Sequence, residues 1–191
     1  ELQIHGIENL VRMEVRQADG DGVSNVTLRD LIRTSLRMRP DRIIVGEVRG
    51  EEALDMIQSM NTGHDGSLST GHANSPQDML SRLETMALIA SDIPIQAIRK
   101  QIASSIDIIV QLERLRDRSR RVTAIAEVLD CTEDAYILNP IFEFHEQDNL
   151  VMESSSYGDI PERVVGQLER TGYHLMHRRK LHAAALESAE I

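Results

Sequence analysis

The sequence predicts an α/β fold in which parallel strands are covered by helices. Three observations predict it. Short apolar runs at residues 42–47, 67–70 and 106–112 have the length of strands. Segments with apolar residues at helical spacing alternate with these runs, at residues 27–36, 51–61, 76–90 and 94–102. The run Arg42-Ile-Ile-Val-Gly-Glu47 has no polar side, which is typical of a parallel strand with helices on both faces.

Length and charge limit the function classes. A chain of 191 residues is long enough for one domain with a core and a small helical appendage. The formal net charge of −10 and an aromatic content of 3% argue against nucleic acid as the main partner, because phosphate binding needs a basic surface and base stacking needs aromatic rings. Cys131 is the single cysteine, so an internal disulfide is excluded. No apolar stretch approaches the length of a membrane span, and we expect a soluble chain.

The first third of the chain contains one predicted strand and one predicted helix. Val11, Met13 and Val15 alternate with charged residues, which predicts a half-buried strand, and a polar loop follows at residues 17–25. Thr27 with Asp30 forms a capping-box pattern at a helix start. The helix also carries a stripe of arginines, for which two interpretations stay open: a solvated face, or donors for phosphate or for carboxylates at an interface. The stripe consists of Arg29, Arg33 and Arg37.

Two polar residues are predicted to leave the sheet at one edge. Glu47 ends the first apolar run, and His72 follows the strand expected at residues 67–70. Because the carboxyl ends of parallel strands face the ligand crevice in open α/β sheets, both side chains are placed to act on a phosphate, a metal or a water. The alternative for Glu47 is a solvated loop glutamate.

The rest of the sequence, from Pro76 on, predicts two helices followed by antiparallel strands. Helices are expected from Pro76 and from Pro94, followed by a buried strand at residues 106–112 and two strands at 122–129 and 135–144 that form an antiparallel edge to the same sheet. A polar stretch at residues 148–159 predicts a linker, and helices are expected at 160–170 and 175–187. The predicted domains are residues 1–147 and a linker with a small helical part at residues 148–191.

Three motifs carry a family resemblance: IIVGEVRG, then TGHDGSLSTGHANSP, then SRLETM. Together, over residues 1–144, they resemble the bacterial type II and type IV secretion ATPases, and most of all the tight-adherence pilus (CpaF-like) branch. The resemblance implies a RecA-like P-loop core with three α/β/α layers. It identifies the first motif as the Walker B element and the second as the histidine box.

The resemblance implies a site for ATP and Mg²⁺. Glu47 would polarise the attacking water or hold the hydrated metal, and His72 would sense the γ-phosphate. Candidate nucleotide-binding residues beside them are Gly46, Thr70, Arg42 and Arg82. The implied partners are a hexameric ring of intact subunits and an inner-membrane secretion or pilus platform protein, with a cytoplasmic location peripheral to the inner membrane.

A phosphate-binding loop is missing from the sequence. The two lysines, Lys100 and Lys180, are not part of a Gly-Lys-Ser/Thr motif. We therefore expect the C-terminal portion of a longer ATPase, without the first strand and helix of the core and inactive by itself. The alternatives are a non-catalytic module that joins or regulates a ring of intact subunits, and a metal-dependent hydrolase that uses Glu47, Asp65 and His72.

Overall fold

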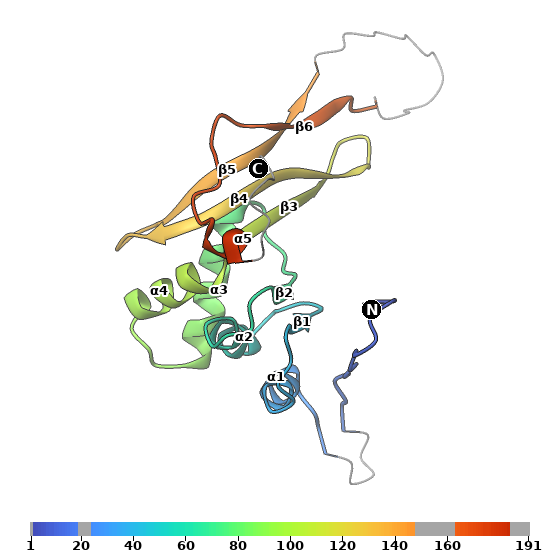
Figure 1. Ribbon diagram of the computed structural model, residues 1–191, viewed down its shortest axis with the longest axis vertical. Coiled ribbons are helices and arrows are strands. Elements are labelled where there is room, and N and C mark those ends of the chain that lie inside the picture. The colour runs from blue at the N-terminus through green and yellow to red at the C-terminus, as the bar shows by residue number, and fades with distance from the viewer. Residues whose placement is uncertain (1, 19–23, 148–162, 184–191) are drawn as a thin grey trace. The chain divides into compact units, whose positions relative to one another are not determined.

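The computed structural model describes residues 2–18, 24–147 and 163–183 (Figure 1). They form a mixed α/β fold, as predicted, in two compact units. The first unit comprises Glu1–Asn74 and Asp78–Ile106, and the second comprises Ser75–Gln77 and Asp107–Ile191. The division between the units therefore falls at residues 106 and 107. The domain boundary expected at residues 147 and 148 borders the undescribed stretch 148–162 and stays a prediction.

The first unit contains four helices and two short strands among its described residues. In chain order these are α1 (Leu28–Leu36), β1 (Ile44–Val45), α2 (Glu52–Met60), β2 (Leu68–Ser69), α3 (Pro76–Ala90) and α4 (Ile95–Ser105). All four predicted helices are confirmed. The predicted capping box is present at α1, where the Thr27 side chain accepts from the Asp30 amide and the Asp30 carboxylate accepts from the Thr27 amide.

Helix α2 is at the centre of the first unit, between α1 and α4 (Figure 1). Its buried residues therefore cover more than one face, and Ala53 and Ile57 are fully buried. Leu80 of α3 and Ile102 of α4 are also fully buried. Burial of this apolar surface stabilises the unit, since each buried isoleucine or leucine side chain contributes about 1.5–3 kcal/mol.

The two strands pair in parallel, with Ile44 opposite Leu68 and Val45 opposite Ser69. A further hydrogen bond from the Val48 amide to the Thr70 carbonyl, 3.0 Å long, continues the pairing past the strand ends. The prediction that the first strand is buried on both faces was wrong. Val45 is buried, but Ile44 and its partner Leu68 are 40% and 60% exposed, because no described element covers that face of the pair.

The strand predicted around Val11, Met13 and Val15 is also not formed. Within the described part of the chain this segment has one isolated bridge, between Arg16 and Val26. A strand needs a hydrogen-bonded neighbour, and alternation of side chains alone does not provide one. Val11 and Val15 accordingly remain exposed.

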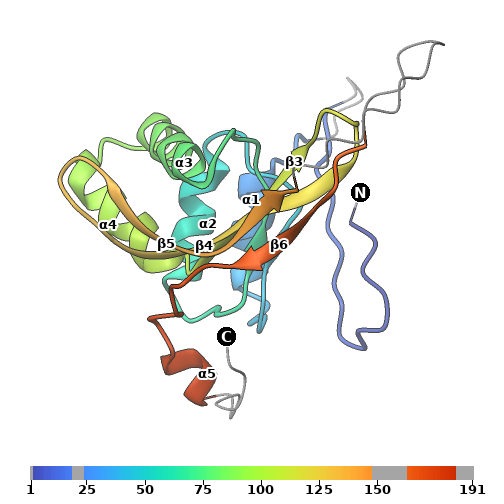
Figure 2. The same ribbon diagram turned by 90° about the horizontal axis from the view of Figure 1, so that it is seen from above.

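The second unit is an antiparallel sheet with strand order β3-β4-β5-β6. Its strands are β3 (Ile108–Arg114), β4 (Arg120–Cys131), β5 (Tyr136–Glu146) and β6 (Gly166–Arg170), and α5 (Arg179–Ala183) follows them (Figure 2). The antiparallel strands are confirmed, but the prediction that the first of them is buried was wrong, since Ile108, Val110 and Leu112 of β3 are 42%, 47% and 63% exposed. The four strands form a sheet of their own, however, and not the edge of the parallel sheet, because β3 pairs with β4 and not with β1 or β2.

The helix predicted at residues 160–170 was wrong over its described part, since residues 166–170 form β6. These residues pair with β5, where Leu168 lies opposite Phe144. Pairing with the open edge of β5 outweighs the weak local preference of this segment for a helix. The helix predicted at 175–187 begins only at Arg179, and residues 184–191 lie outside the described part. Among the described residues, no helix is long and apolar enough to cross a bilayer.

Candidate functional site

Glu47 and His72 meet at the carboxyl ends of the two parallel strands. The Oε1 atom of Glu47 lies 3.0 Å from Nε2 of His72. Glu47 follows β1 by two residues and His72 follows β2 by three, so the parallel pairing brings both to one edge, as predicted. The side chain of Glu47 is 16% exposed and that of His72 is 82% exposed. The imidazole is therefore accessible, and the carboxylate lies largely beneath it.

Arg49 holds the other oxygen of the Glu47 carboxylate. Its Nε donates to Oε2 of Glu47 at 2.6 Å. This hydrogen bond, with the charges of Arg49, His72 and Arg82, lowers the pKa of Glu47 against the opposing effect of partial burial. Sequence reasoning missed Arg49. The available signal was its place two residues after Glu47, because alternate residues of an extended segment point to the same side.

Arg82 reaches the same site from α3. Its Nη1 donates to the carbonyl oxygen of His72 at 3.0 Å, and its side chain is exposed. The contact holds the backbone at His72 and adds a positive charge near Glu47. The structure thus brings together Glu47, His72 and Arg82, and adds Arg49.

Gly46 and Thr70 fix the backbone just beyond the carboxyl ends of β1 and β2. The hydroxyl of Thr70 donates to the carbonyl oxygen of Gly46. Beyond this point, Glu52 at the start of α2 accepts from the amides of Arg49 and Gly50 at 2.6 and 3.0 Å. These bonds restrain the short segment that carries Glu47.

Two predicted residues do not join this group. Arg42 precedes β1, at the opposite end of the strand from Glu47, and its side chain lies against Gly66. Gly66 has a φ of +80°, a conformation suited to glycine, and a Cβ there would lie 2.9 Å from Nε of Arg42. Asp65 does not converge with Glu47 and His72. In residues 2–18, 24–147 and 163–183, no three His, Cys, Asp or Glu side chains could hold a metal ion. The metal-dependent hydrolase, which required that convergence, is not supported.

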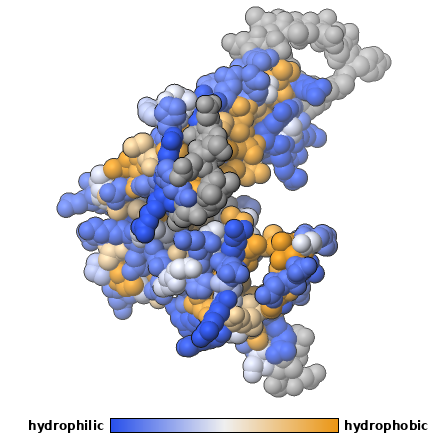
Figure 3. Space-filling view, viewed as in Figure 1, coloured by the Kyte–Doolittle hydropathy of each residue, from blue (hydrophilic) through white to orange (hydrophobic). Residues whose placement is uncertain are grey.

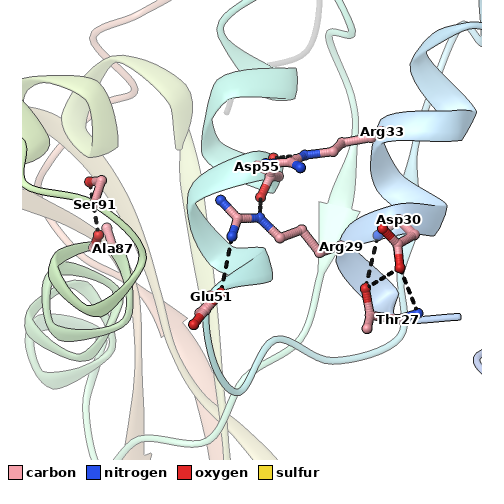
Figure 4. Close-up of polar contacts among 8 residues, drawn as sticks. All are labelled: Thr27, Arg29, Asp30, Arg33, Glu51, Asp55, Ala87 and Ser91. Carbon is pink, nitrogen blue, oxygen red and sulfur yellow. Dashed lines mark hydrogen bonds and ion pairs between the residues drawn. The ribbon is translucent and has the colours of Figure 1, made fainter. Parts of the chain in front are cut away.

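The arginine stripe of α1 has a use that neither interpretation foresaw. Arg29 and Arg33 both donate through Nε to the buried carboxylate of Asp55 on α2, at 2.5 and 2.7 Å (Figure 4). Arg29 also contacts Glu51 through Nη1 at 3.0 Å. Two of the three arginines therefore fasten α1 to α2, and Arg37 is exposed to solvent.

Comparison with known proteins assigns the family. The sequence model of the type II/IV secretion system proteins matches residues 1–156. The chain belongs to this family. The family assignment confirms the resemblance, while the tight-adherence branch within the family stays a prediction.

Relatives of this secretion-system chain include proteins of conjugation and of type IV secretion. The conjugal transfer protein TrbB of Rhizobium radiobacter is 39% identical over 54% of this chain and 31% of its own length. The type IV secretion system protein VirB11 of Bartonella quintana is 37% identical over 58% of this chain and 32% of its own length. The chain therefore spans about a third of the length of these curated relatives.

A solved structure supports the same assignment. The VirB11 ATPase of the Brucella suis type IV secretion system, in complex with sulphate, matches with a TM-score of 0.51 and 33% identity. The match covers 53% of this secretion-system chain and 32% of that protein. The α/β character of the fold is thus shared with a secretion ATPase.

The site of this secretion-system chain combines one carboxylate, Glu47, with several side chains that donate hydrogen bonds. The lowered pKa keeps Glu47 ionised at neutral pH, so that it can orient a water or balance a cation. His72 and Arg49 bring N–H groups to the Glu47 carboxylate, and Arg82 donates to the His72 carbonyl oxygen beside it. Such a set suits an anion with a cation or a water beside it.

Proposed function

We propose that this chain is the C-terminal portion of a hexameric RecA-like ATPase that couples ATP hydrolysis to protein secretion or pilus assembly. The observation that carries the proposal is the 3.0 Å contact between Glu47 and His72 at the carboxyl ends of two parallel strands. Membership of the type II/IV secretion system proteins, and the name of the Brucella suis relative as an ATPase, support the same reading.

Each residue of the site has a proposed role. Glu47 polarises the attacking water or holds the hydrated Mg²⁺, and His72 senses the γ-phosphate through its exposed imidazole. Arg82 orients the backbone at His72, while Thr70 and Gly46 hold the backbone beyond the carboxyl ends of β1 and β2 in register. Arg42 is proposed to act in nucleotide binding from outside this group.

The donor set fits the γ-phosphate end of ATP with Mg²⁺. A single ionised carboxylate beside three N–H-bearing side chains matches a hydrated cation next to a phosphate, since Mg²⁺ in proteins keeps several waters and takes few carboxylates. ATP supplies the phosphoanhydride bond, and Mg²⁺ neutralises the charge that develops on the phosphates. The chain itself contributes the base, the sensor and the positioning contacts.

The proposed partners are copies of the intact subunit in a six-membered ring and a platform protein of the inner membrane. The proposed location is the cytoplasmic face of that membrane, without a direct role for nucleic acid. The Bartonella quintana relative, which is named as a type IV secretion system protein, supports this setting.

Hydrolysis measurements test the proposal. The 191-residue chain by itself should not hydrolyse Mg-ATP, because a Gly-Lys-Ser/Thr loop is absent from its sequence. Joining it to the upstream part of the Rhizobium TrbB protein should yield hydrolysis that Glu47→Gln reduces by a factor on the order of 100 or more. Robust hydrolysis by the isolated chain, or a folded fusion whose activity is unaffected by Glu47→Gln, would refute the proposal.

A second candidate function is a non-catalytic module that joins or regulates a ring of intact subunits. The module would bind full-length subunits and would alter their hydrolysis without any dependence on its own Glu47. The Glu47→Gln variant therefore separates the two functions.

A further inference from the structure

The hairpin between β3 and β4 carries an unusual concentration of arginine. Five arginines occur within eight residues, namely Arg114, Arg116, Arg118, Arg120 and Arg121. The whole chain has a net charge of −10, whereas the hairpin is locally positive. The function proposed above uses none of these side chains.

Their arrangement is unfavourable without an added anion. Arg114 and Arg120 are directly opposite each other in the strand register, where like charges destabilise a pair of strands. Arg118 in the turn has a φ of +66°, which a residue with a side chain seldom adopts. Among the described residues, these three arginines form no ion pair, while Arg116 is paired with Glu146. These three arginines are exposed to solvent, and residues 113–121 contain five arginines against the two carboxylates of Glu113 and Asp117.

An apolar row leads to the same place along β3. Ile108, Val110 and Leu112 are 42%, 47% and 63% exposed. Alternate residues of a strand point to the same face, so the row continues directly into Arg114. Figure 3 shows apolar surface beside hydrophilic surface over the four-stranded sheet. The hairpin is therefore amphipathic, with arginine at its end and exposed apolar side chains behind it.

We propose that the β3–β4 hairpin binds the phosphate groups of an anionic membrane surface. Arg114, Arg118 and Arg120 contact headgroup phosphates, and Leu112 enters the interfacial layer. A guanidinium binds a phosphate through two parallel N–H bonds, so a phosphate between Arg114 and Arg120 replaces their repulsion by attraction. The inference deepens the proposed function and rests on it for the membrane location, since it adds a direct contact to the one made through partners.

The observations favour a membrane over nucleic acid or an acidic protein. No aromatic residue occurs in residues 113–121 for bases to stack on, and the chain as a whole is acidic. An acidic protein would have to place carboxylates at positions that match the three arginines, whereas an anionic membrane surface presents negative charge across its whole area. The negative charge elsewhere does not prevent binding, because salt screens it beyond about 8 Å at physiological ionic strength.

Vesicle flotation tests the inference. The 191-residue chain should float with phosphatidylcholine vesicles that contain phosphatidylglycerol, should not float with phosphatidylcholine alone, and should dissociate as salt is added. Joint replacement Arg114→Gln, Arg118→Gln and Arg120→Gln should weaken binding by on the order of 100-fold, since each arginine near such a surface contributes about a factor of five. The matched control is the triple variant Arg16→Gln, Arg37→Gln and Arg39→Gln, which removes the same charge from exposed residues of the first unit and should weaken binding far less.

Two further variants keep the result unambiguous. Arg120→Glu converts the opposed pair into an attractive one, so it should weaken vesicle binding without lowering the thermal midpoint, which excludes unfolding as the cause. Glu47→Gln should bind vesicles like the parent chain, and because hydrolysis is measured on the TrbB fusion instead, vesicle binding and ATP hydrolysis fail or succeed separately.

Four results would overturn the inference. These are equal flotation with uncharged vesicles, an equal loss in the matched control, tighter binding to a single-stranded oligonucleotide than to vesicles, and displacement by inorganic phosphate at the concentration of the lipid phosphate. The last result would assign the arginines to a free anion.

Discussion

At the scale of single residues, Glu47 is held by two partners at once. Arg49 contacts one oxygen, and His72 contacts the other at 3.0 Å. The carboxylate is therefore both oriented and kept ionised. Because its pKa is lower in the folded chain than the ordinary 4.5, ionised Glu47 stabilises the fold above that value, and the contribution disappears as the pH falls through the folded pKa.

Replacement of Arg49 should therefore change the titration of Glu47. In Arg49→Gln the pKa of Glu47 should rise toward its ordinary value, because the hydrogen bond from Arg49 is the largest cause of the lowering. Carbon-13 NMR of the side-chain carboxyl group, followed over pH, measures the change. Arg37→Gln, an exposed arginine on α1, is the control. An unchanged pKa in Arg49→Gln would show that Arg49 does not hold the carboxylate in solution.

At the scale of elements, a buried carboxylate fastens α1 to α2. Asp55 accepts from Arg29 and Arg33, and its side chain is only 8% exposed (Figure 4). The helix α2 that starts at Glu52 also fixes the segment with Glu47, because Glu52 accepts from the amides of Arg49 and Gly50. The pairing of Asp55 with the two arginines of α1 therefore supports the site indirectly, because it holds α2 in place.

Loss of this carboxylate should destabilise the first unit. Asp55→Ala removes the carboxylate that pairs with two guanidinium groups, and we expect the free energy of unfolding to fall by about 2–4 kcal/mol, which is somewhat less than for a fully buried ion pair because Arg33 is half-exposed. Urea unfolding measures the difference. Glu51→Gln removes the exposed partner of Arg29 and should cost less than about 0.5 kcal/mol. If Asp55→Ala and Glu51→Gln lowered the free energy of unfolding equally, Asp55 would not be the residue that fastens α1 to α2.

At the scale of the whole molecule, two carboxylates anchor the C-terminal segment to its own unit. Asp117, in the β3–β4 turn, accepts from the amide of Val164 at 3.0 Å, and Ser119 and this bond lower the pKa of Asp117 to about 2. Glu127 of β4 is 1% exposed and accepts from the amides of Met176 and His177 at 2.9 and 2.7 Å. Burial raises the pKa of Glu127, but these bonds and one from Asn139 bring it below its ordinary value. Both carboxylates therefore stay ionised to a lower pH than they would in an unfolded chain.

Neutralising the buried anchor should loosen the chain beyond β6. In Glu127→Gln the amides of Met176 and His177 should exchange with deuterium about 10- to 100-fold faster, because hydrogen bonds to a charged group contribute about 1.5–3 kcal/mol. Hydrogen exchange followed by NMR at neutral pH measures this. Glu143→Gln, exposed on β5, is the control and should leave the exchange unchanged. Unchanged exchange in Glu127→Gln would show that the segment is held by β6 alone.

The four helices of the first unit were predictable because their signals are local. Thr27 and Asp30 mark one start, Pro76 another, and apolar residues at helical spacing mark the buried faces. The meeting of Glu47 with His72 was predictable for a similar reason, since each follows a strand of a parallel pair. Arg49 and Asp55 were not predicted, because the partner of a charged side chain depends on which segments become neighbours.

The sequence by itself therefore determined the four helices of the first unit, the α/β class, the family and the edge of the parallel strands where Glu47 and His72 lie, since periodicity, caps and motifs depend on consecutive residues. Only the tertiary structure decided the strand pairings. Residues 11–16 alternate like a strand but have no described partner beyond the bridge at Arg16, while residues 166–170 became a strand because the edge of β5 was open to them. A helix satisfies its backbone within its own segment, but a strand takes its hydrogen bonds from elsewhere in the chain.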